Sequence, residues 1–293
     1  MSKSGRGLSA FQTWTEFLAA WAFLKTMGLL PVDTASDVGG WLGRQLGPRS
    51  SRHRRALANL DRVFPDKTAA EKQAIARAVW DNAGRVFAEY AHIKHIVQED
   101  GRIEVTGLED LRPHLSDDKG GFLLTAHYGN WEVTTLAGLR LGLSQYNLYR
   151  APRNPHVDRL LAKLRGEMVA GGLLPKGDGN LRDILRLLRQ NHYIGMVVDQ
   201  REARGLTLSF LGQDSTTVHS PALLARRTGV PIFLGRALRT RSAHFRLECV
   251  AIPVDVTDDW ENDVRTTTQR INDVITRWVV EAPEQWLWFH RRW

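Results

Sequence analysis

The chain has 293 residues, 43% of them hydrophobic, so it can bury a substantial core and does not have the composition of a disordered protein. A single cysteine, Cys249, excludes an intrachain disulfide and suits a reducing compartment. The net charge of +8 indicates an anionic partner and leaves nucleic acid, a phospholipid surface and an acidic protein open.

The N-terminal segment predicts a helix at a membrane surface. Residues 8–30 are rich in Leu, Phe, Trp and Ala, and apolar side chains recur at helical spacing in Phe11, Trp14, Leu18 and Trp21. The uncharged part is far shorter than the roughly 20 residues that cross a bilayer, and no cleavable signal peptide is recognisable. We expect an amphipathic helix that lies at the interface; a plain core helix and a marginal membrane span are the alternatives.

Further helices follow within the first hundred residues. Residues 33–47 carry three glycines at four-residue spacing, which allow another helix to approach closely: Gly39, Gly43 and Gly47. Thr68 and Glu71 form a capping-box pattern, and an apolar stripe continues from it through Ile75, Val79, Ala83, Phe87 and Tyr90. His92 and His95 have no further metal ligands in reach, so we expect turn residues near a helix C-terminus and no metal site.

Positive charge is concentrated between residues 49 and 55, in Arg49, Arg52, His53, Arg54 and Arg55. The chain also ends in a mixed cationic and aromatic sequence, residues 290–293, and holds ten tryptophans. Tryptophan combined with arginine or lysine is typical of proteins at a bilayer interface. We therefore expect an anionic membrane surface as a partner; a solvated basic face is the plain alternative.

Beyond residue 100, short apolar runs alternate with amphipathic segments, a pattern typical of a largely parallel sheet covered by helices. Helices are expected at residues 154–169 and around residues 181–188. An alternating run predicts one face of a strand with an inert core thiol, formed by Phe245, Leu247, Cys249 and Ala251. The predicted fold is α/β, a mostly parallel sheet flanked by helices, with a helical, membrane-associated region (residues 1–100) before an α/β domain (residues 101–293).

Three of the apolar runs end in a polar side chain. Residues 121–126 lead to His127, residues 146–149 to Arg150, and residues 193–198 to Asp199. In open α/β sheets the carboxyl ends of the strands form the ligand crevice. We therefore expect these three side chains to converge there.

His127 and Glu132 have the chemistry of a base and a carboxylate that orients it. Residues five apart diverge on one helix, but a strand, a turn at Gly129 and Asn130, and a helix over residues 131–141 allow the two to meet. No serine or cysteine stands beside the pair, so the substrate's own hydroxyl is the expected attacking group and acyl transfer the expected reaction. The plain alternative is a loop histidine and a glutamate that favours a helix N-terminus.

Several catalytic and cofactor motifs are absent from the sequence. There is no nucleophile elbow, no phosphate-binding loop, no His-Glu-x-x-His and no paired cysteines. We therefore expect neither a metal nor a cofactor.

The stretch His127-Tyr-Gly-Asn-Trp-Glu132 resembles the signature of glycerolipid-type acyltransferases, in particular of the bacterial lipid A secondary acyltransferases. Other blocks of that family resemble residues 149–160, Val198-Asp199-Gln200 with residues 205–212, residues 221–231, and residues 283–292. The resemblance runs from about residue 25 to the end, with the blocks in the same order, which is far more specific than any single motif.

The resemblance implies transfer of a fatty acyl chain from acyl carrier protein to a hydroxyl of an acylated, phosphorylated sugar lipid at the cytoplasmic face of a bacterial inner membrane. His127 would be the general base and Glu132 its orienting carboxylate. Arg150 would bind phosphate on the acceptor or on the carrier's pantetheine arm. Asn130, Asp199 and Gln200 are the remaining expected substrate contacts.

Two departures from the family pattern leave the acceptor open. Gln200 and Arg201 stand between Asp199 and the next acidic residue, Glu202, and His219 and Ser220 precede the fourth block. A lyso-aminolipid, a lysophospholipid or another glycolipid is therefore an alternative acceptor, and acyl-CoA an alternative donor. A basic nucleic-acid-binding protein is the alternative from a different class, but the usual binding signatures are absent and we expect no nucleic acid.

Overall fold

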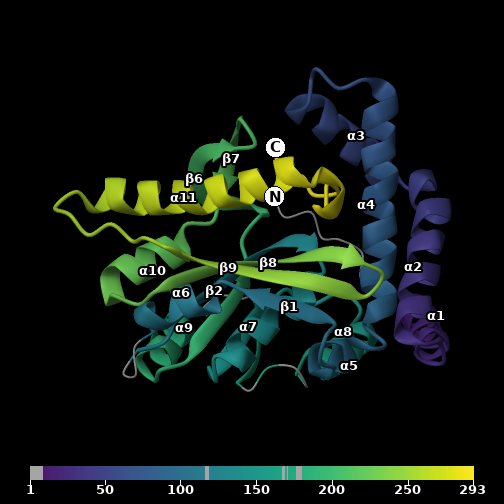
Figure 1. The fold of residues 1–293 in the computed structure, drawn as a ribbon, viewed down its shortest axis with the longest axis horizontal. Coiled ribbons are helices and arrows are strands. Elements are labelled where there is room, and N and C mark those ends of the chain that lie inside the picture. Colours follow the sequence, from purple (N-terminus) through teal and green to yellow (C-terminus); the bar gives the residue numbers. More distant parts are fainter. Residues whose placement is uncertain (1–8, 116–118, 167–168, 170, 176–179) are drawn as a thin grey trace.

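The structure is a computed structural model that describes residues 9–115, 119–166, 169, 171–175 and 180–293. Its centre is a seven-stranded sheet with the strand order β1-β9-β8-β2-β5-β3-β4 (Figure 1). Strands β8, β2, β5, β3 and β4 run parallel to one another, whereas β9 is antiparallel to β8 and β1 runs with β9. The predicted α/β class with a mostly parallel sheet is confirmed.

The bounds of the strands follow the predicted apolar runs closely. The main sheet consists of β1 (Ile103–Thr106), β2 (Gly121–Gly129), β3 (Gln145–Tyr149), β4 (Gly172–Pro175), β5 (Tyr193–Val197), β8 (Ile232–Arg241) and β9 (His244–Ile252). A separate antiparallel hairpin is formed by β6 (Arg201–Phe210) and β7 (Gln213–Thr217). The predicted run ending at Ala126 continues as strand for three more residues, so His127 belongs to β2 itself.

In the described part of the chain, the helices that precede the sheet are α1 (Ala10–Gly28), α2 (Val32–Leu46), α3 (Ser51–Val63), α4 (Ala69–Glu89) and α5 (Ile93–Gln98), with a short 3-10 turn η1 (Gly47–Arg49). The capping box of Thr68 and Glu71 is confirmed at the start of α4. The glycines of α2 lie against α4: a Cβ at Gly43 would stand 2.0 Å from the backbone oxygen of Trp80. The predicted apolar stripe is wrong at one position, because Phe87 is 56% exposed.

The remaining helices cover the faces of the sheet and the ends of its strands. They are α6 (Leu108–Leu111), α7 (Thr135–Arg140), α8 (Pro155–Gly166), α9 (Asn180–Arg189), α10 (Ser220–Thr228) and α11 (Trp260–Glu281), with 3-10 turns η2 (Arg112–His114), η3 (Trp131–Thr134) and η4 (Pro283–Gln285). The predicted helix at residues 154–169 is thus α8, which Asn154 caps through the backbone amides of His156 and Val157. Residues 167 and 168 of that prediction lie outside the described residues.

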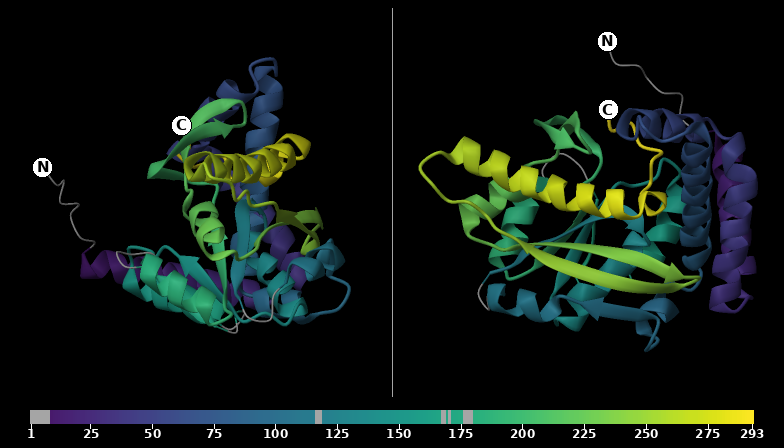
Figure 2. Two further views of the ribbon diagram at one scale, coloured as in Figure 1. Left: turned by 90° about the vertical axis from the view of Figure 1, so that its left-hand side faces the viewer. Right: turned by 45° about the horizontal axis from the view of Figure 1, so that its top comes forward.

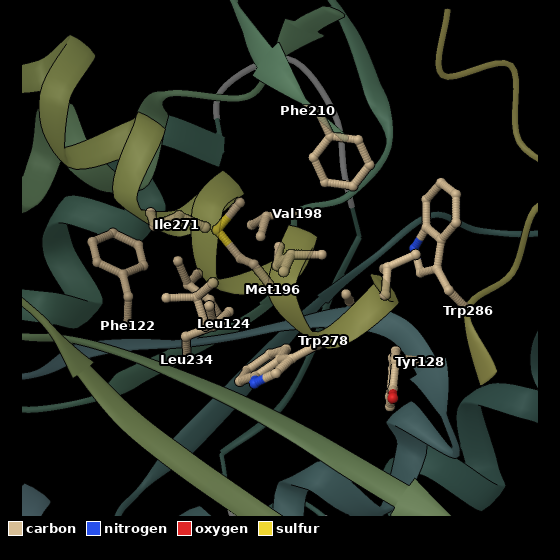
Figure 3. Packing of buried hydrophobic residues seen from close by; sticks show 14 of the residues in the cluster. Phe122, Leu124, Tyr128, Met196, Val198, Phe210, Leu234, Ile271, Trp278 and Trp286 are labelled. Carbon is tan, nitrogen blue, oxygen red and sulfur yellow. The ribbon is translucent and has the colours of Figure 1, made fainter. Parts of the chain in front are cut away.

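The hydrophobic core joins the N-terminal helices to the sheet. Alternate residues of β2, among them Phe122, Leu124 and Tyr128, face the same cluster as Trp278 of α11 (Figure 3). That cluster also takes in Leu60 of α3 and apolar residues of α4. Helix α5 ends at Gln98 and β1 begins at Ile103, and the helices and the sheet share one core.

Helix α1 keeps a row of large apolar side chains exposed. The exposed fractions are 78% for Phe11, 50% for Trp14, 53% for Leu18 and 45% for Trp21. Among the described residues, no helix has the length and apolar content that a bilayer crossing requires. Helix α1 contacts α8 on one side of the molecule, while α3 and the β6–β7 hairpin lie on the other side (Figures 1 and 2).

Candidate active site

His127 lies near the carboxyl end of the central strand β2. Its neighbours Ala126 and Tyr128 are fully buried on the core side, so the alternation of the strand directs His127 to the opposite face. There it borders a cavity of about 310 Å³, with 14% of its side chain exposed. The strand ends at Gly129. Its φ of 53° is a conformation that side chains disfavour, and a Cβ at this position would stand 1.7 Å from the carbonyl oxygen of Ala237.

The carboxylate beside the imidazole is that of Asp199. His127 Nδ1 lies 2.8 Å from Asp199 Oδ1, and the backbone N–H of His127 donates to Oδ2 at 2.8 Å. The indole of Trp286 donates to the same oxygen at 2.7 Å. Asp199 follows β5, which pairs in parallel with β2, so both residues emerge at one edge of the sheet. Since a carboxylate accepts the Nδ1 proton, Nε2 is the basic nitrogen of His127.

Asp199 is fully buried, yet its carboxyl group remains ionised. Burial raises the pKa of Asp199, but the adjacent His127 and the hydrogen bonds from it outweigh burial and hold the pKa well below its usual range. A fixed negative charge therefore stands behind the imidazole, an arrangement that can stabilise an imidazolium at this position.

Glu132 does not orient His127, which corrects the interpretation from the motif. Its carboxylate accepts hydrogen bonds from Tyr90, from the indole of Trp131 and from both Nε and Nη2 of Arg165, the last at 2.6 Å. The reason is local geometry: the turn at residue 130 starts η3 and carries Glu132 towards α4 and α8 instead of back to the strand.

Arg165 and Glu132 form a buried ion pair that the sequence reading did not identify. Burial lowers the pKa of Arg165, but the charge of Glu132 outweighs it and raises the pKa above its ordinary value. Burial and the charge of Glu132 also raise the pKa of Tyr90, so the phenol stays neutral. Both Arg165 and Glu132 border the cavity, which places a compensated pair, rather than a free charge, in its wall.

Asn130, an expected substrate contact, has its side chain engaged within the protein. Its side chain is fully buried, Nδ2 donates to Glu89 at 2.7 Å, and Oδ1 accepts from the backbone amide of Glu132. Both ends of the amide are thus used to hold the turn that follows β2. Asn130 is not among the described residues that border the cavity.

Gln200 and Arg150 do border the cavity. The amide nitrogen of Gln200 lies 3.5 Å from His127 Nε2, on the side of the ring that faces away from Asp199. Arg150 follows β3, is exposed, and makes no hydrogen bond or ion pair within the described part of the chain. The structure therefore brings His127, Asp199, Gln200 and Arg150 to one site and separates Glu132 from the imidazole.

The C-terminal segment completes the surroundings of His127. The ring centre of His290 lies 4.6 Å from that of His127, and the ring centre of Trp131 lies 5.0 Å from it in an edge-to-face arrangement. Burial, followed by the charge of His127, lowers the pKa of His290 to about 4, so this ring is neutral at neutral pH. Arg292 is fully buried and holds the segment by donating to the backbone oxygen of Gln200 at 3.1 Å. His290 and Arg292 belong to the last family block, residues 283–292, but the sequence of that block does not indicate which of its side chains face the strand ends.

The cavity runs from His127 along the face of the sheet that α7 covers. Its far part is bordered by apolar residues of several elements, among them Leu111, Leu123, Ala137, Phe233 and Cys249. Burial raises the pKa of the Cys249 thiol to about 12, which agrees with the expected inert core cysteine. No group of side chains with the composition of a metal site occurs among the described residues.

The comparisons with known proteins identify the family of the chain. The profile of the bacterial lipid A biosynthesis acyltransferase family matches residues 1–293. The lipid A biosynthesis palmitoleoyltransferase of Escherichia coli (strain K12) is 23% identical over 290 residues, which cover 96% of this chain and 90% of that protein. The lauroyltransferase of the same strain is 24% identical over 296 residues (96% and 90%), and the myristoyltransferase 24% over 286 residues (94% and 85%). Because the family profile matches the whole chain, the chain belongs to the bacterial lipid A biosynthesis acyltransferase family and is an O-acyltransferase.

Proposed function

We propose that this protein transfers an acyl chain from an acyl thioester directly to a hydroxyl of a lipid A precursor. The observation that carries the proposal is the pair of His127 and Asp199: a buried, ionised carboxylate holds Nδ1 and leaves Nε2 at a cavity with an apolar far end. The relatives named above are lipid A acyltransferases, which supports a lipid A precursor as the acceptor.

The attacking hydroxyl comes from the acceptor. Cys249 borders the cavity, but its raised thiol pKa disfavours the thiolate, and the hydroxyl of Thr125 donates to the neighbouring carbonyl. In the proposed reaction His127 Nε2 removes the proton from the acceptor hydroxyl, and the oxygen attacks the thioester carbonyl carbon. The C–S bond then breaks, and the leaving thiolate receives the proton from the imidazolium to become the free thiol. Asp199 stabilises the charged ring between these two steps.

The other expected residues have distinct roles in this proposal. Arg150 binds a phosphate group of the acceptor or of the donor's pantetheine arm, since its guanidinium is exposed at the cavity and carries no compensating partner among the described residues. Gln200 lies beside Nε2 and contacts the reacting hydroxyl. Glu132 is a positioning residue, because it acts by fixing Arg165 in the cavity wall.

We further propose that the protein works at the cytoplasmic face of the inner membrane, held there by α1 as a peripheral anchor. The exposed row of Phe11, Trp14, Leu18 and Trp21 supports this, as does Lys25, whose ammonium lies 5.9 Å from the centre of the Trp21 ring. Helix α1 also contacts the loop that follows β3 and contains Arg150: the side-chain amide of Asn154 donates to the backbone oxygen of Thr13 at 2.8 Å. The anchor and the phosphate-binding loop are thus neighbours.

The test is acyl transfer by the purified full chain and its His127→Ala variant, with a lipid A precursor in detergent micelles and the product measured by mass spectrometry. Loss of the general base is expected to lower kcat by about 10⁴-fold. Circular dichroism of both proteins controls for the fold. A folded variant with normal turnover would disprove the role of His127, and a product formed on another lyso-lipid but not on the lipid A precursor would disprove the acceptor.

A further inference from the structure

The basic cluster found in the sequence lies beside the active site. Helix α3 packs along the C-terminal segment: Arg55 donates to the carbonyl of Phe289 at 3.0 Å, and Asn59 donates to those of Trp288 and His290. The ring of His290 in turn contacts His127. Burial and the charge of His127 lower the pKa of His290 most, Asp199 opposes them, and the charges of Arg52 and Arg55 lower it further, in agreement with the packing of α3 against this segment.

Several arginines lie around this segment without an ion pair to any residue that the structure describes. Arg52 and Arg291 are exposed and form no ion pair with any described residue, and the hydrogen bond of Arg55 goes to a neutral carbonyl. Arg201 borders the cavity, is exposed, and donates to the hydroxyl of Thr216. Arg291 lies in the C-terminal segment and Arg52, Arg55 and Arg201 lie beside it; these four arginines are called the α3 patch below.

The surface of α3 suits a protein partner better than a bilayer. A helix that lies in a membrane presents large apolar side chains to it, and α1 does so. Helix α3 contributes none of the exposed large hydrophobic residues among the described part of the chain, and its exposed positions are Ser51, Arg52, Arg54, Ala58, Asp61 and Arg62. Figures 1 and 2 show α1 and α3 on different sides of the molecule.

Direct transfer requires two binding surfaces, which agrees with α1 and α3 lying on different sides of the molecule (Figures 1 and 2). Because no acyl-enzyme forms in the proposed reaction, the thioester donor and the lipid acceptor must be bound at the same moment. The lipid reaches the site from the side of α1, where the membrane lies, so the donor needs another approach. The α3 patch lies on the side of the molecule away from α1 (Figure 2), its member Arg201 borders the cavity, and its charge attracts an acidic surface.

We propose that the α3 patch is the docking surface for an acidic carrier protein that delivers the acyl thioester to His127. This inference rests on the acyl transfer proposed above. The carrier's negative face lies on Arg52 and its neighbours, and the thin prosthetic arm passes the C-terminal segment into the cavity. The membrane and the carrier then bind on opposite sides of one site.

The test compares two donors with the same acyl chain, one on acyl carrier protein and one on coenzyme A, using the purified full chain. Arg52→Glu and the double variant Arg52→Glu/Arg291→Glu are measured against Arg54→Glu, which makes the same charge change on another face of α3. We expect Arg52→Glu to lower kcat/KM for the carrier relative to coenzyme A about tenfold, and the double variant to lower it further. Arg54→Glu should leave the ratio within twofold, and added salt should lower the wild-type ratio.

Each other outcome has a definite meaning. Equal losses with both donors, an unchanged ratio, or a wild-type enzyme that accepts only the coenzyme A donor would overturn the docking surface. Loss of binding to anionic vesicles with an unchanged ratio would show that the patch serves the membrane instead. Wild-type protein that transfers from neither donor would disprove the proposed function itself, which separates the two failures.

Discussion

Two buried carboxylates stand at the end of strand β2, and they differ in what holds them. Asp199 is bound by the imidazole of His127 and the indole of Trp286, whereas Glu132 is bound by the guanidinium of Arg165, a phenol and an indole. An imidazole gains and loses its proton near neutral pH, while a guanidinium keeps its charge. In our proposal the carboxylate next to the exchangeable proton serves catalysis, and the one next to the permanent charge serves the architecture of the cavity.

Asp199→Asn tests the catalytic half of this comparison and has the largest expected effect. The amide keeps the shape of the side chain but no longer balances the imidazolium, and it holds the ring in the wrong tautomer through its own N–H. We expect kcat to fall about 10³-fold with little change in KM. The measurement is a steady-state assay of the folded variant. A variant within tenfold of the wild-type kcat would show that the carboxylate is not needed behind His127.

The strand ends that form the site could be predicted from the sequence, but the contact between His127 and Asp199 could not. Parallel strands place His127 and Asp199 at one edge of the sheet, and three apolar runs were enough to predict that. Asp199, the hydrogen-bond partner of His127, lies 72 residues away in the chain. Glu132 is an equally acidic candidate and much nearer, and spacing in the sequence alone does not decide which of the two carboxylates contacts the imidazole.

The partners of Glu132 were harder still to find. Arg165 looks like any basic residue in the last turn of an amphipathic helix, and Tyr90 like a member of an apolar stripe. Their role depends on how α4 and α8 are packed against η3, which is a tertiary property. The same holds for Trp286, whose indole reaches Asp199 across 87 residues.

Glu132→Gln tests the architectural half. It leaves the guanidinium of Arg165 with a neutral partner in a mostly buried position, and we expect a loss of about 3 kcal/mol in the free energy of unfolding. The measurement is urea unfolding followed by circular dichroism. The double variant Glu132→Gln/Arg165→Met removes both charges and should recover most of that stability.

Activity in the same set of variants sharpens the comparison. If Glu132 acts through Arg165, Glu132→Gln and Arg165→Met lower kcat/KM to similar extents, and the double variant is no worse than Arg165→Met alone. Losses that multiply in the double variant would instead give Glu132 a role of its own in the reaction.

His290 extends the comparison to pH and has the smallest expected effect. Its pKa in the folded protein is about 4, below the 6.5 of an ordinary histidine, so between these values the unfolded chain binds a proton that the folded chain does not. Stability is therefore complete above pH 6.5 and falls as the pH decreases towards 4. Between pH 6.5 and 5 this one group accounts for about 2 kcal/mol of the free energy of unfolding. His290→Asn should flatten that slope, measured by urea unfolding at each pH, whereas the matched exposed variant His95→Asn should leave it in place. A slope unchanged by His290→Asn would show that the loss of stability in acid arises elsewhere, and that the ring beside His127 is not held neutral by its burial.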